Sequence, residues 1–425
     1  MRATFQGSIV AMVTPFRGGK VDEAKIRELV EFHVKNGTDA VVPCGTTGES
    51  PTLTHAEHKR VVEIVTEAAR GRVTVIAGTG SNSTAEAIDL TIHAKKAGVQ
   101  GALVVNPYYN RPTQEGLYRH FRAIAEAVDI PILVYNIAGR TAVNVETETL
   151  ARLAKDCPNI VGVKEASGSL DQMTQVILTC GPDFTVLSGD DNLTLPLMSV
   201  GGRGVISVIA NFVPRETVEM THAALAGDWK LARELHLKLY PLSRAMFIET
   251  NPIPVKETMA MMGMIEPEFR LPMCRMAEPN RQRLKAILVQ HGLLKGCPGL
   301  PWRTWLSPAR PAGWEAVLSR CSRTTRSCAS WRHWKGPGTR RSSRTPAKRR
   351  ASGGSTCPSP PTPRAPSART GSSSSSPSPT PASPICAWSP DWAAARSSGP
   401  RASRWPSARR SSASPRTRPC SCRRT

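Results

Sequence analysis

A lysine that follows an apolar run is the residue of this sequence best suited to covalent chemistry. Lys164 comes directly after Ile160–Val163, where the chain should be buried. An apolar environment disfavours the charged form of an amine, and a neutral amine can attack a carbonyl carbon to form a Schiff base. The same position also suits a structural ion pair with Glu165 or another acid, so position alone leaves both interpretations open.

Three further groups lie at the ends of similar runs and suit the same chemistry. Tyr135 has a phenol that can relay protons, although a strand tyrosine can also simply fill a core. Arg140 can bind a carboxylate through two hydrogen bonds, or it can be an ordinary surface arginine. The Gly45–Gly48 segment offers backbone N–H groups and two hydroxyls to a small carboxylate, or it forms a plain turn. Together these groups suit carbanion or enamine chemistry on a small keto acid.

The elements that must position these residues repeat along the chain. Eight short apolar runs start roughly 20 to 35 residues apart, the spacing of parallel strands joined by helices. The runs are Ser8–Pro15, Ala40–Cys44, Val73–Gly78, Gly101–Pro107, Pro131–Ile137, Ile160–Lys164, Phe184–Ser188 and Gly204–Ala210. They predict an α/β protein with a closed (β/α)8 TIM barrel, and a doubly wound open sheet is the alternative. Barrel active sites lie at the carboxyl ends of the strands, which is where the candidate groups occur.

Local signals also indicate where helices begin and how the chain is divided. Capping boxes at Thr54–Glu57, Ser83–Glu86 and Ser169–Gln172 predict three helix starts. Helical patterns without further strands follow the eighth run. We therefore predict a catalytic barrel over residues 1–227 and a C-terminal helical extension over residues 228–296.

Residues 297–425 differ from the rest of the chain in composition. They hold 22 Arg and 2 Lys against 2 acidic residues, and so carry nearly all of the net charge of +23. This Ser-, Pro- and Arg-rich tail has too little aliphatic surface to offset the entropy of ordering, and we expect it to be disordered. Its charge and eight Trp would suit a nucleic-acid-binding module. However, it lacks any fold motif. Its bias towards Ser, Pro, Arg, Ala, Trp and Cys is typical of a GC-rich gene read out of frame, which favours a frameshift or read-through product instead.

Several classes of protein are excluded by what residues 1–296 lack. No apolar run reaches the roughly 18 residues of a membrane helix. The amino terminus does not have the pattern of a signal peptide. Four Cys occur without a C-x-x-C pair, which favours free thiols in a reducing cytoplasm. Metal-ligand clusters, a P-loop and a dinucleotide-binding glycine pattern are also missing.

Six motifs in order resemble the 4-hydroxy-tetrahydrodipicolinate synthase (dihydrodipicolinate synthase) family. They are GTTGES (45–50), NPYYNRPTQEG (106–116), YNIAGRT (135–141), GVKEASG (162–168), LSGDD (187–191) and GVISVIAN (204–211). The resemblance covers about residues 1–294. It implies a lyase of the class I aldolase type, within the N-acetylneuraminate lyase superfamily, that condenses pyruvate with L-aspartate 4-semialdehyde in lysine and diaminopimelate biosynthesis.

The resemblance implies a role for each matching residue. Lys164 would be the Schiff-base lysine, and the proton relay would consist of Tyr135, Thr46 and a neighbouring subunit's Tyr109. Thr47, Gly45 and the adjacent backbone would hold the pyruvate carboxylate, Ile206 would line the pocket, and Arg140 would bind the carboxylate of the semialdehyde. No metal or organic cofactor is implied, because the lysine is itself the electron sink.

The same resemblance implies assembly and regulation. Completing the relay across a subunit boundary requires at least a dimer, and a homotetramer built as a dimer of dimers is expected. L-Lysine would act as a feedback inhibitor at positions matching Ser50, Pro51, His55, His58, Asn82, Glu86 and Tyr108. Neither a membrane nor a specific nucleic acid is expected as a partner.

Two points qualify the resemblance. Ala138 stands where the family usually has Pro, which should loosen the approach to Arg140 without removing its guanidinium. Other pyruvate-dependent aldolases of the superfamily, such as N-acetylneuraminate lyase or a 2-keto-3-deoxy sugar acid aldolase, share the lysine and the tyrosine. The acceptor pocket distinguishes them, since Arg140 suits a short acidic aldehyde.

Overall fold

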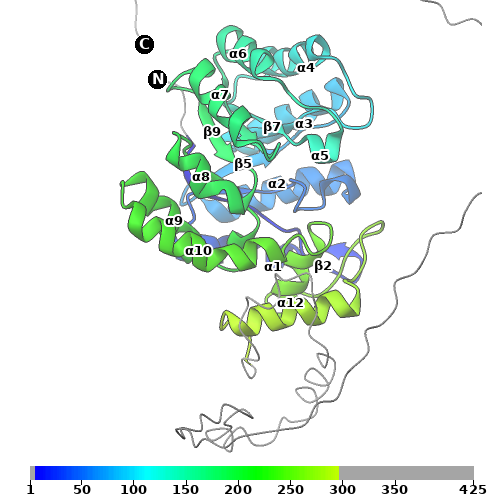
Figure 1. Cartoon of the computed structure of the whole chain (residues 1–425). Helices are drawn as coiled ribbons and strands as arrows, with labels where there is room; N and C mark the ends of the chain where they lie inside the picture. Colours follow the sequence, from blue (N-terminus) through cyan, green and yellow to red (C-terminus); the bar gives the residue numbers. More distant parts are fainter. Residues whose placement is uncertain (1–4, 296–425) are drawn as a thin grey trace, which may run out of the picture. The chain divides into compact units, whose positions relative to one another are not determined.

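Eight parallel strands close into a barrel in the computed structural model, which describes residues 5–295 (Figure 1). The strands are β1 (Gly7–Ala11), β4 (Ala40–Val42), β5 (Thr74–Gly78), β6 (Gly101–Val105), β7 (Ile132–Asn136), β8 (Ile160–Glu165), β9 (Thr185–Ser188) and β10 (Gly204–Ser207). They pair in chain order, and β1 pairs with both β4 and β10. The TIM barrel predicted from the sequence is confirmed, and the open sheet is wrong.

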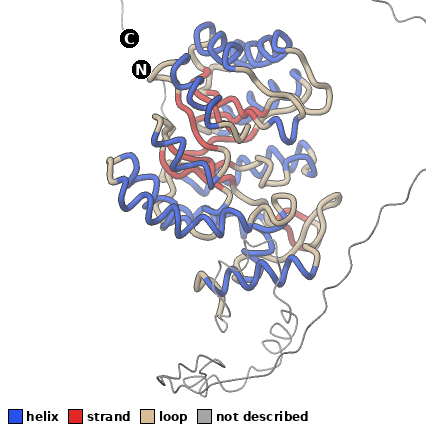
Figure 2. The backbone as a smooth tube through the Cα atoms, in the orientation of Figure 1, coloured by secondary structure: helices blue, strands red, loops and turns tan. Residues whose placement is uncertain are grey.

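Helices surround the strands, as Figure 2 shows in blue and red. They are α1 (Glu23–Lys35), α2 (His55–Ala69), α3 (Thr84–Ala97), α4 (Gln114–Ala127), α5 (Ala138–Thr141), α6 (Thr147–Asp156), α7 (Leu170–Cys180), α8 (Thr194–Ser199) and α9 (Pro214–Leu225). Three more follow, namely α10 (Trp229–Ala245), α11 (Ile253–Met261) and α12 (Glu278–Gln290). None of the helices between residues 5 and 295 is long and apolar enough to cross a membrane.

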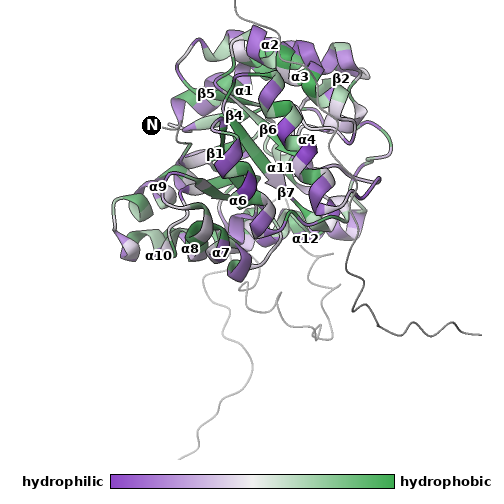
Figure 3. Ribbon diagram, turned by 90° about the horizontal axis from the view of Figure 1, so that it is seen from above, coloured by the Kyte–Doolittle hydropathy of each residue, from purple (hydrophilic) through white to green (hydrophobic). Residues whose placement is uncertain are grey.

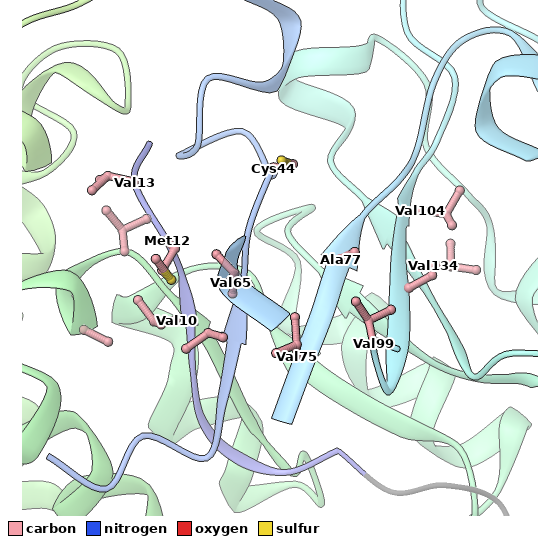
Figure 4. Packing of buried hydrophobic residues seen from close by; sticks show 14 of the residues in the cluster. Val10, Met12, Val13, Cys44, Val65, Val75, Ala77, Val99, Val104 and Val134 are labelled. Carbon is pink, nitrogen blue, oxygen red and sulfur yellow. The ribbon is translucent and has the colours of Figure 1, made fainter. Parts of the chain in front are cut away.

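The apolar strands are buried on both faces. Inside the barrel, an inner cluster comprises Phe5, Ile9, Ala11, Ala40, Val42, Ile76, Leu103, Leu133, Tyr135, Val161, Leu187 and Ile206. Alternate strand residues, such as Val10, Val75 and Val104, pack outward with the helices in a larger cluster, part of which is seen in Figure 4. Figure 3 shows the same arrangement from above, with hydrophobic strands at the centre. This two-sided burial explains why the runs are continuously apolar.

Two of the three predicted capping boxes are only half formed. Thr54 and Glu57 make the full reciprocal pair. Ser83 and Ser169 cap their helices through their hydroxyls, but the side chains of Glu86 and Gln172 do not reach back. Both side chains instead hydrogen-bond to other residues around the candidate site, so neither is available to the backbone N–H of its cap residue.

Strand β8 contains an irregularity that determines where its side chains point. Ile132 pairs with Ile160, whereas the next residue, Leu133, pairs with Gly162, so Val161 is an extra residue. Val161 belongs to the inner cluster, but Val163 packs outward. A bulge of this kind shifts the inward–outward alternation by one position. Lys164 therefore lies on the inner side of the barrel.

The sequence did not predict a short antiparallel hairpin after β1. It consists of β2 (Phe16–Arg17) and β3 (Lys20–Val21). The predicted first and eighth runs also extend further than the strands do, since β1 ends at Ala11 and β10 ends at Ser207. The predicted tail, residues 297–425, lies outside the described residues.

Three buried histidines should make the fold sensitive to acid. Burial lowers the pKa of His33 to about 3 and the pKa of His58 and His120 to about 4. The unfolded chain takes up these protons near pH 6.5, before the folded chain does. The free energy of unfolding should therefore fall as the pH drops from about 6.5 towards 4, by up to about 1.4 kcal/mol per pH unit for each histidine.

Urea unfolding at a series of pH values would measure this dependence. His33→Leu removes one of the three groups, and its stability should depend less steeply on pH. If the free energy of unfolding depends on pH equally steeply in the variant and in the unaltered chain, the expectation is contradicted.

Candidate active site

Lys164 and Tyr135 meet at the carboxyl ends of neighbouring strands. They are register partners in β8 and β7. The Lys164 ammonium nitrogen lies 4.1 Å from the centre of the Tyr135 ring. Both residues are buried, with 5% and 6% of their surface exposed. A primary amine is thus held against a phenol inside the barrel, among apolar side chains.

Glu165 is not the partner of Lys164. It is fully buried on the opposite side of β8, and its carboxylate accepts hydrogen bonds from Asn136 Nδ2 (3.1 Å to each oxygen), the Ser167 N–H (2.9 Å) and Gln172 Nε2 (3.2 Å). Burial raises the pKa of Glu165, and these donors oppose the rise. The alternative of a Lys164–Glu165 ion pair is therefore wrong. The network instead fixes the ends of β7 and β8.

A second acid lies close enough for the charge of Lys164 to act on it. Asp190 follows β9, and burial raises its pKa while the positive charge of Lys164 opposes that rise. Its neighbour Asp191 is buried and accepts hydrogen bonds from the N–H groups of Val208 (2.9 Å) and Ile209 (3.2 Å). The LSGDD motif contains both acids, but the sequence did not indicate that their surroundings differ in this way.

A cavity of about 600 Å³ opens over this end of the barrel. Of the residues singled out in the sequence, Gly45, Thr46, Tyr135, Arg140, Ser50, Pro51, His55, His58, Glu86 and Tyr108 line it. Lys164, Thr47, Ile206, Asn82 and Tyr109 are not among its lining residues. Tyr135, which lines the cavity, has the Lys164 nitrogen against its ring. Ile206 is fully buried in the inner cluster. One cavity thus joins the predicted substrate residues to most of the predicted effector residues.

Asn251, which sequence reasoning missed, links the two predicted carboxylate-binding elements. Its Nδ2 donates to the Thr47 hydroxyl (3.0 Å), and its backbone carbonyl accepts from Arg140 Nη2 (3.0 Å). The residue lines the cavity, and its own Oδ1 is buried without a hydrogen-bond partner. The only sequence signal was an Asn-Pro-Ile-Pro run in the predicted helical extension.

Ala138 occupies the first residue of α5, the short helix that carries Arg140. Proline is favoured at this position, because its fixed φ suits the first turn and the N–H there has no helical partner. Ala138→Pro should therefore raise the free energy of unfolding by roughly 0.4–1 kcal/mol, mainly by restricting the unfolded chain. Thermal and urea unfolding of the variant would test this. A loss of stability would mean that the turn needs a conformation that proline cannot adopt.

Tyr109 is the predicted relay residue that this chain does not bring to its own site. Its side chain is 91% exposed, and its backbone is left-handed, with φ of 71°. A left-handed conformation is uncommon for a residue with a side chain and is retained where the surroundings require it.

Two of the predicted effector positions, His55 and Glu86, are in direct contact, and a third, Asn82, binds another residue nearby. His55 Nε2 lies 2.5 Å from one oxygen of Glu86, and the Ser81 hydroxyl donates to the other. Asn82 accepts a hydrogen bond from Asn110 through its carbonyl. Ser81 was not predicted, although it lies beside Asn82. These contacts explain why Glu86 does not complete its capping box.

Comparison with known proteins identifies the family. The Dihydrodipicolinate synthetase family matches residues 4–291, about two thirds of the chain. The chain belongs to this family. Its members named as curated relatives include the 4-hydroxy-tetrahydrodipicolinate synthase of Syntrophus aciditrophicus, which is 59% identical over 290 residues, covering 68% of this chain and 99% of the relative.

Solved structures of dihydrodipicolinate synthases agree with the fold. The Aquifex aeolicus enzyme is 54% identical with a TM-score of 0.67, covering 68% of this chain and 99% of the other. The Acinetobacter baumannii synthase, solved with pyruvate, is 45% identical (TM-score 0.67, 68% and 100% covered). The Cyanidioschyzon merolae synthase, solved with lysine bound, is 43% identical (TM-score 0.66, 68% and 99% covered).

As a member of the dihydrodipicolinate synthetase family, the chain is a lyase of the class I aldolase type that belongs to lysine and diaminopimelate biosynthesis. The predictions of family and enzyme class are confirmed. In the part of the chain that the structure describes, no group of three or more His, Cys, Asp or Glu residues is arranged to hold a metal ion.

Proposed function

We propose that this chain condenses pyruvate with L-aspartate 4-semialdehyde to form 4-hydroxy-tetrahydrodipicolinate. The observation that carries the proposal is the buried amine of Lys164 against Tyr135, beside a cavity lined by Thr46 and Arg140. The pyruvate-bound A. baumannii relative supports the identity of the first substrate.

The proposed chemistry uses Lys164 as nucleophile and electron sink. Its amine attacks C2 of pyruvate, and loss of water gives an imine. Loss of a methyl proton gives an enamine, whose methylene carbon bonds to the aldehyde carbon of the semialdehyde while the aldehyde oxygen takes up a proton. The amino group of the acceptor then attacks the imine carbon, which closes the ring and releases Lys164.

The surrounding residues would move protons and hold the two carboxylates. Tyr135 and Thr46 line the cavity beside the amine and suit the proton transfers. Gly45 and Thr47 would hold the pyruvate carboxylate, with Ile206 packed in the barrel below. The Arg140 guanidinium would bind the carboxylate of the semialdehyde.

Assembly would complete the relay. The exposed Tyr109 supports a role at a neighbouring subunit's site, since it does not line the cavity of its own chain. We propose a homodimer as the minimal active unit and a dimer of dimers as the full assembly, which sedimentation would measure. One related solved synthase is described as a monomeric variant, so assembly has to be measured for each member. We also propose that the enzyme works in the cytoplasm, because Cys44, Cys157 and Cys274 are free thiols.

Turnover with different acceptors tests the proposed function. The purified full chain is given pyruvate with L-aspartate 4-semialdehyde or, separately, with N-acetylmannosamine or glyceraldehyde. Consumption of pyruvate only with the semialdehyde is the expected result. Turnover with a sugar aldehyde would instead identify an aldolase of sugar acids and would remove the role given to Arg140.

L-Lysine is proposed as a feedback inhibitor that binds at Ser50, Pro51, His55, His58, Asn82, Glu86 and Tyr108. The lysine-bound C. merolae relative supports this proposal. The Glu86 carboxylate is suited to pair with the α-amine of the effector, which would have to displace His55. His58 is held neutral by burial, which lowers its pKa to about 4.

Glu86→Gln should therefore raise the lysine concentration for half-inhibition by at least about tenfold, because it removes the charge of a charge-assisted hydrogen bond. Inhibition is expressed relative to each variant's own uninhibited rate. Glu148→Gln, on an exposed face of α6, is the matched control and should be inhibited normally. Unchanged inhibition of Glu86→Gln would reject the assigned site.

A further inference from the structure

A completely buried ion pair joins the loop after β4 to helix α11. Lys256 Nζ lies 2.5 Å from Glu49 Oε1, and the two side chains are 0% and 1% exposed. The other carboxylate oxygen of Glu49 accepts from the N–H of Arg270 (3.3 Å). The ammonium also lies 4.3 Å from the centre of the Phe16 ring and 5.0 Å from that of Phe269. The ammonium thus has one carboxylate and two aromatic rings as its close neighbours, and the charges of Glu268 and Arg270 also act on it.

Glu49 is the last residue of the turn that carries the proposed carboxylate-binding groups. Its backbone is left-handed, with φ of 52°, and its N–H donates to the Thr46 carbonyl (3.2 Å). The preceding carbonyl, that of Gly48, accepts from the Thr14 hydroxyl (2.7 Å). The first of these hydrogen bonds couples the backbone of Glu49 directly to that of Thr46.

Stability alone does not account for such a pair. Burial lowers the pKa of Lys256, and the charge of Glu49 opposes that shift. Removing two charges from water is costly, and replacing a buried ion pair with apolar residues is often neutral or stabilising. A fully satisfied buried pair instead makes the structure around it more rigid, since neither charge can leave its partner without being left unpaired away from water.

Two neighbouring contacts act on the same loop from the same stretch of chain. Asn251 donates to the Thr47 hydroxyl, as described above. Arg270 binds the Glu57 carboxylate with both Nη atoms (2.8 and 2.6 Å) and donates to the Thr52 carbonyl (3.1 Å). Residues 251–270 therefore hold the segment 47–57 at successive points, and Lys256 is the most deeply buried of these contacts.

We propose that Glu49 and Lys256 are positioning residues that set the Gly45–Thr47 loop to bind the carboxylate of the keto acid. This inference rests on the proposed function, because it assumes that the loop binds that carboxylate. Neither side chain needs to touch the substrate. The segment that follows the barrel would then be a part of the active site, although it contributes no reacting group.

Trapping of the Schiff base tests this without the second substrate. The full chain is incubated with a series of pyruvate concentrations, reduced with borohydride, and the modified fraction is measured by mass spectrometry. The main variant is the double substitution Glu49→Gln with Lys256→Met, which removes both charges at nearly constant volume. Lys256→Met alone would leave a buried unpaired carboxylate and would lose stability.

We expect the double variant to melt within a few degrees of the unaltered chain. Its half-saturating pyruvate concentration should rise at least about tenfold, while the modified fraction at saturating pyruvate stays the same. The control Lys285→Met, at an exposed position of α12, should change neither value. A double variant with a normal half-saturating pyruvate concentration would overturn the proposal. A decrease only in the modified fraction at saturating pyruvate would overturn it as well. Absence of any adduct in the unaltered chain would instead reject the proposed function, and the positioning role with it.

Discussion

Replacing Lys164 by methionine should lower turnover by at least about 10³-fold, because within residues 5–295 the other buried lysine, Lys256, is paired with Glu49 and cannot replace it. Lys164 is the lysine whose nitrogen lies against Tyr135, and Lys256 is committed to Glu49. The Lys164→Met variant should also lose the borohydride-trapped pyruvate adduct. Its melting temperature should not fall greatly, because methionine fills a similar volume and needs no polar partner inside the barrel.

The matched comparison is Lys256→Met, which replaces a second buried lysine. At saturating pyruvate that variant should still form the adduct on any protein that remains folded. Peptide mapping of the unaltered chain should place the adduct on Lys164. An adduct on another lysine, or appreciable turnover by Lys164→Met, would show that the nucleophile lies elsewhere.

Gly162→Ala should damage both stability and activity. A Cβ at this position would lie 2.2 Å from the carbonyl oxygen of Thr185 in β9, which is backbone and cannot easily move aside. Overpacking of this kind costs roughly 1–3 kcal/mol. The bulge at Val161 lies beside it, so relief of the clash would disturb the register that turns Lys164 into the barrel.

Gly139→Ala is the control for this substitution, because nothing lies within 4 Å of a Cβ built there. It should change the free energy of unfolding by less than about 0.5 kcal/mol. Urea unfolding and the pyruvate-trapping assay measure the two effects. A Gly162→Ala protein with normal stability and normal adduct formation would show that β8 tolerates a shift without moving Lys164.

The sequence was sufficient to predict the barrel because burial on both faces leaves an unmistakable run of apolar residues. The eight runs predicted the eight strands, and the residues at their ends predicted Lys164 beside Tyr135. The direction of the side chains in β8 was not predictable, because Ile-Val-Gly-Val is apolar on both faces and hides the bulge. The hairpin of β2 and β3 has only two residues in each strand, too few to form a pattern.

Contacts between distant segments were the other feature that the sequence could not predict. Glu49 is one residue of the GTTGES motif, and Lys256 is one residue of the predicted helical extension. Nothing in either local pattern indicates that they pair. The same holds for Asn251 and Thr47, and for Asp190, whose nearness to Lys164 depends on how β8 and β9 adjoin.

The buried pair has a consequence for the order in which the molecule acquires its function. Glu49 and Lys256 are 207 residues apart in the chain, and Thr47 and Asn251 are 204 apart. Contacts of such long range form late, since a long loop must close before they stabilise anything. During refolding, strands β4 to β9, which pair with their neighbours in the chain, should become protected before the chain regains the ability to capture pyruvate. On the ribosome, a nascent barrel would remain inactive until helix α11 has emerged and docked.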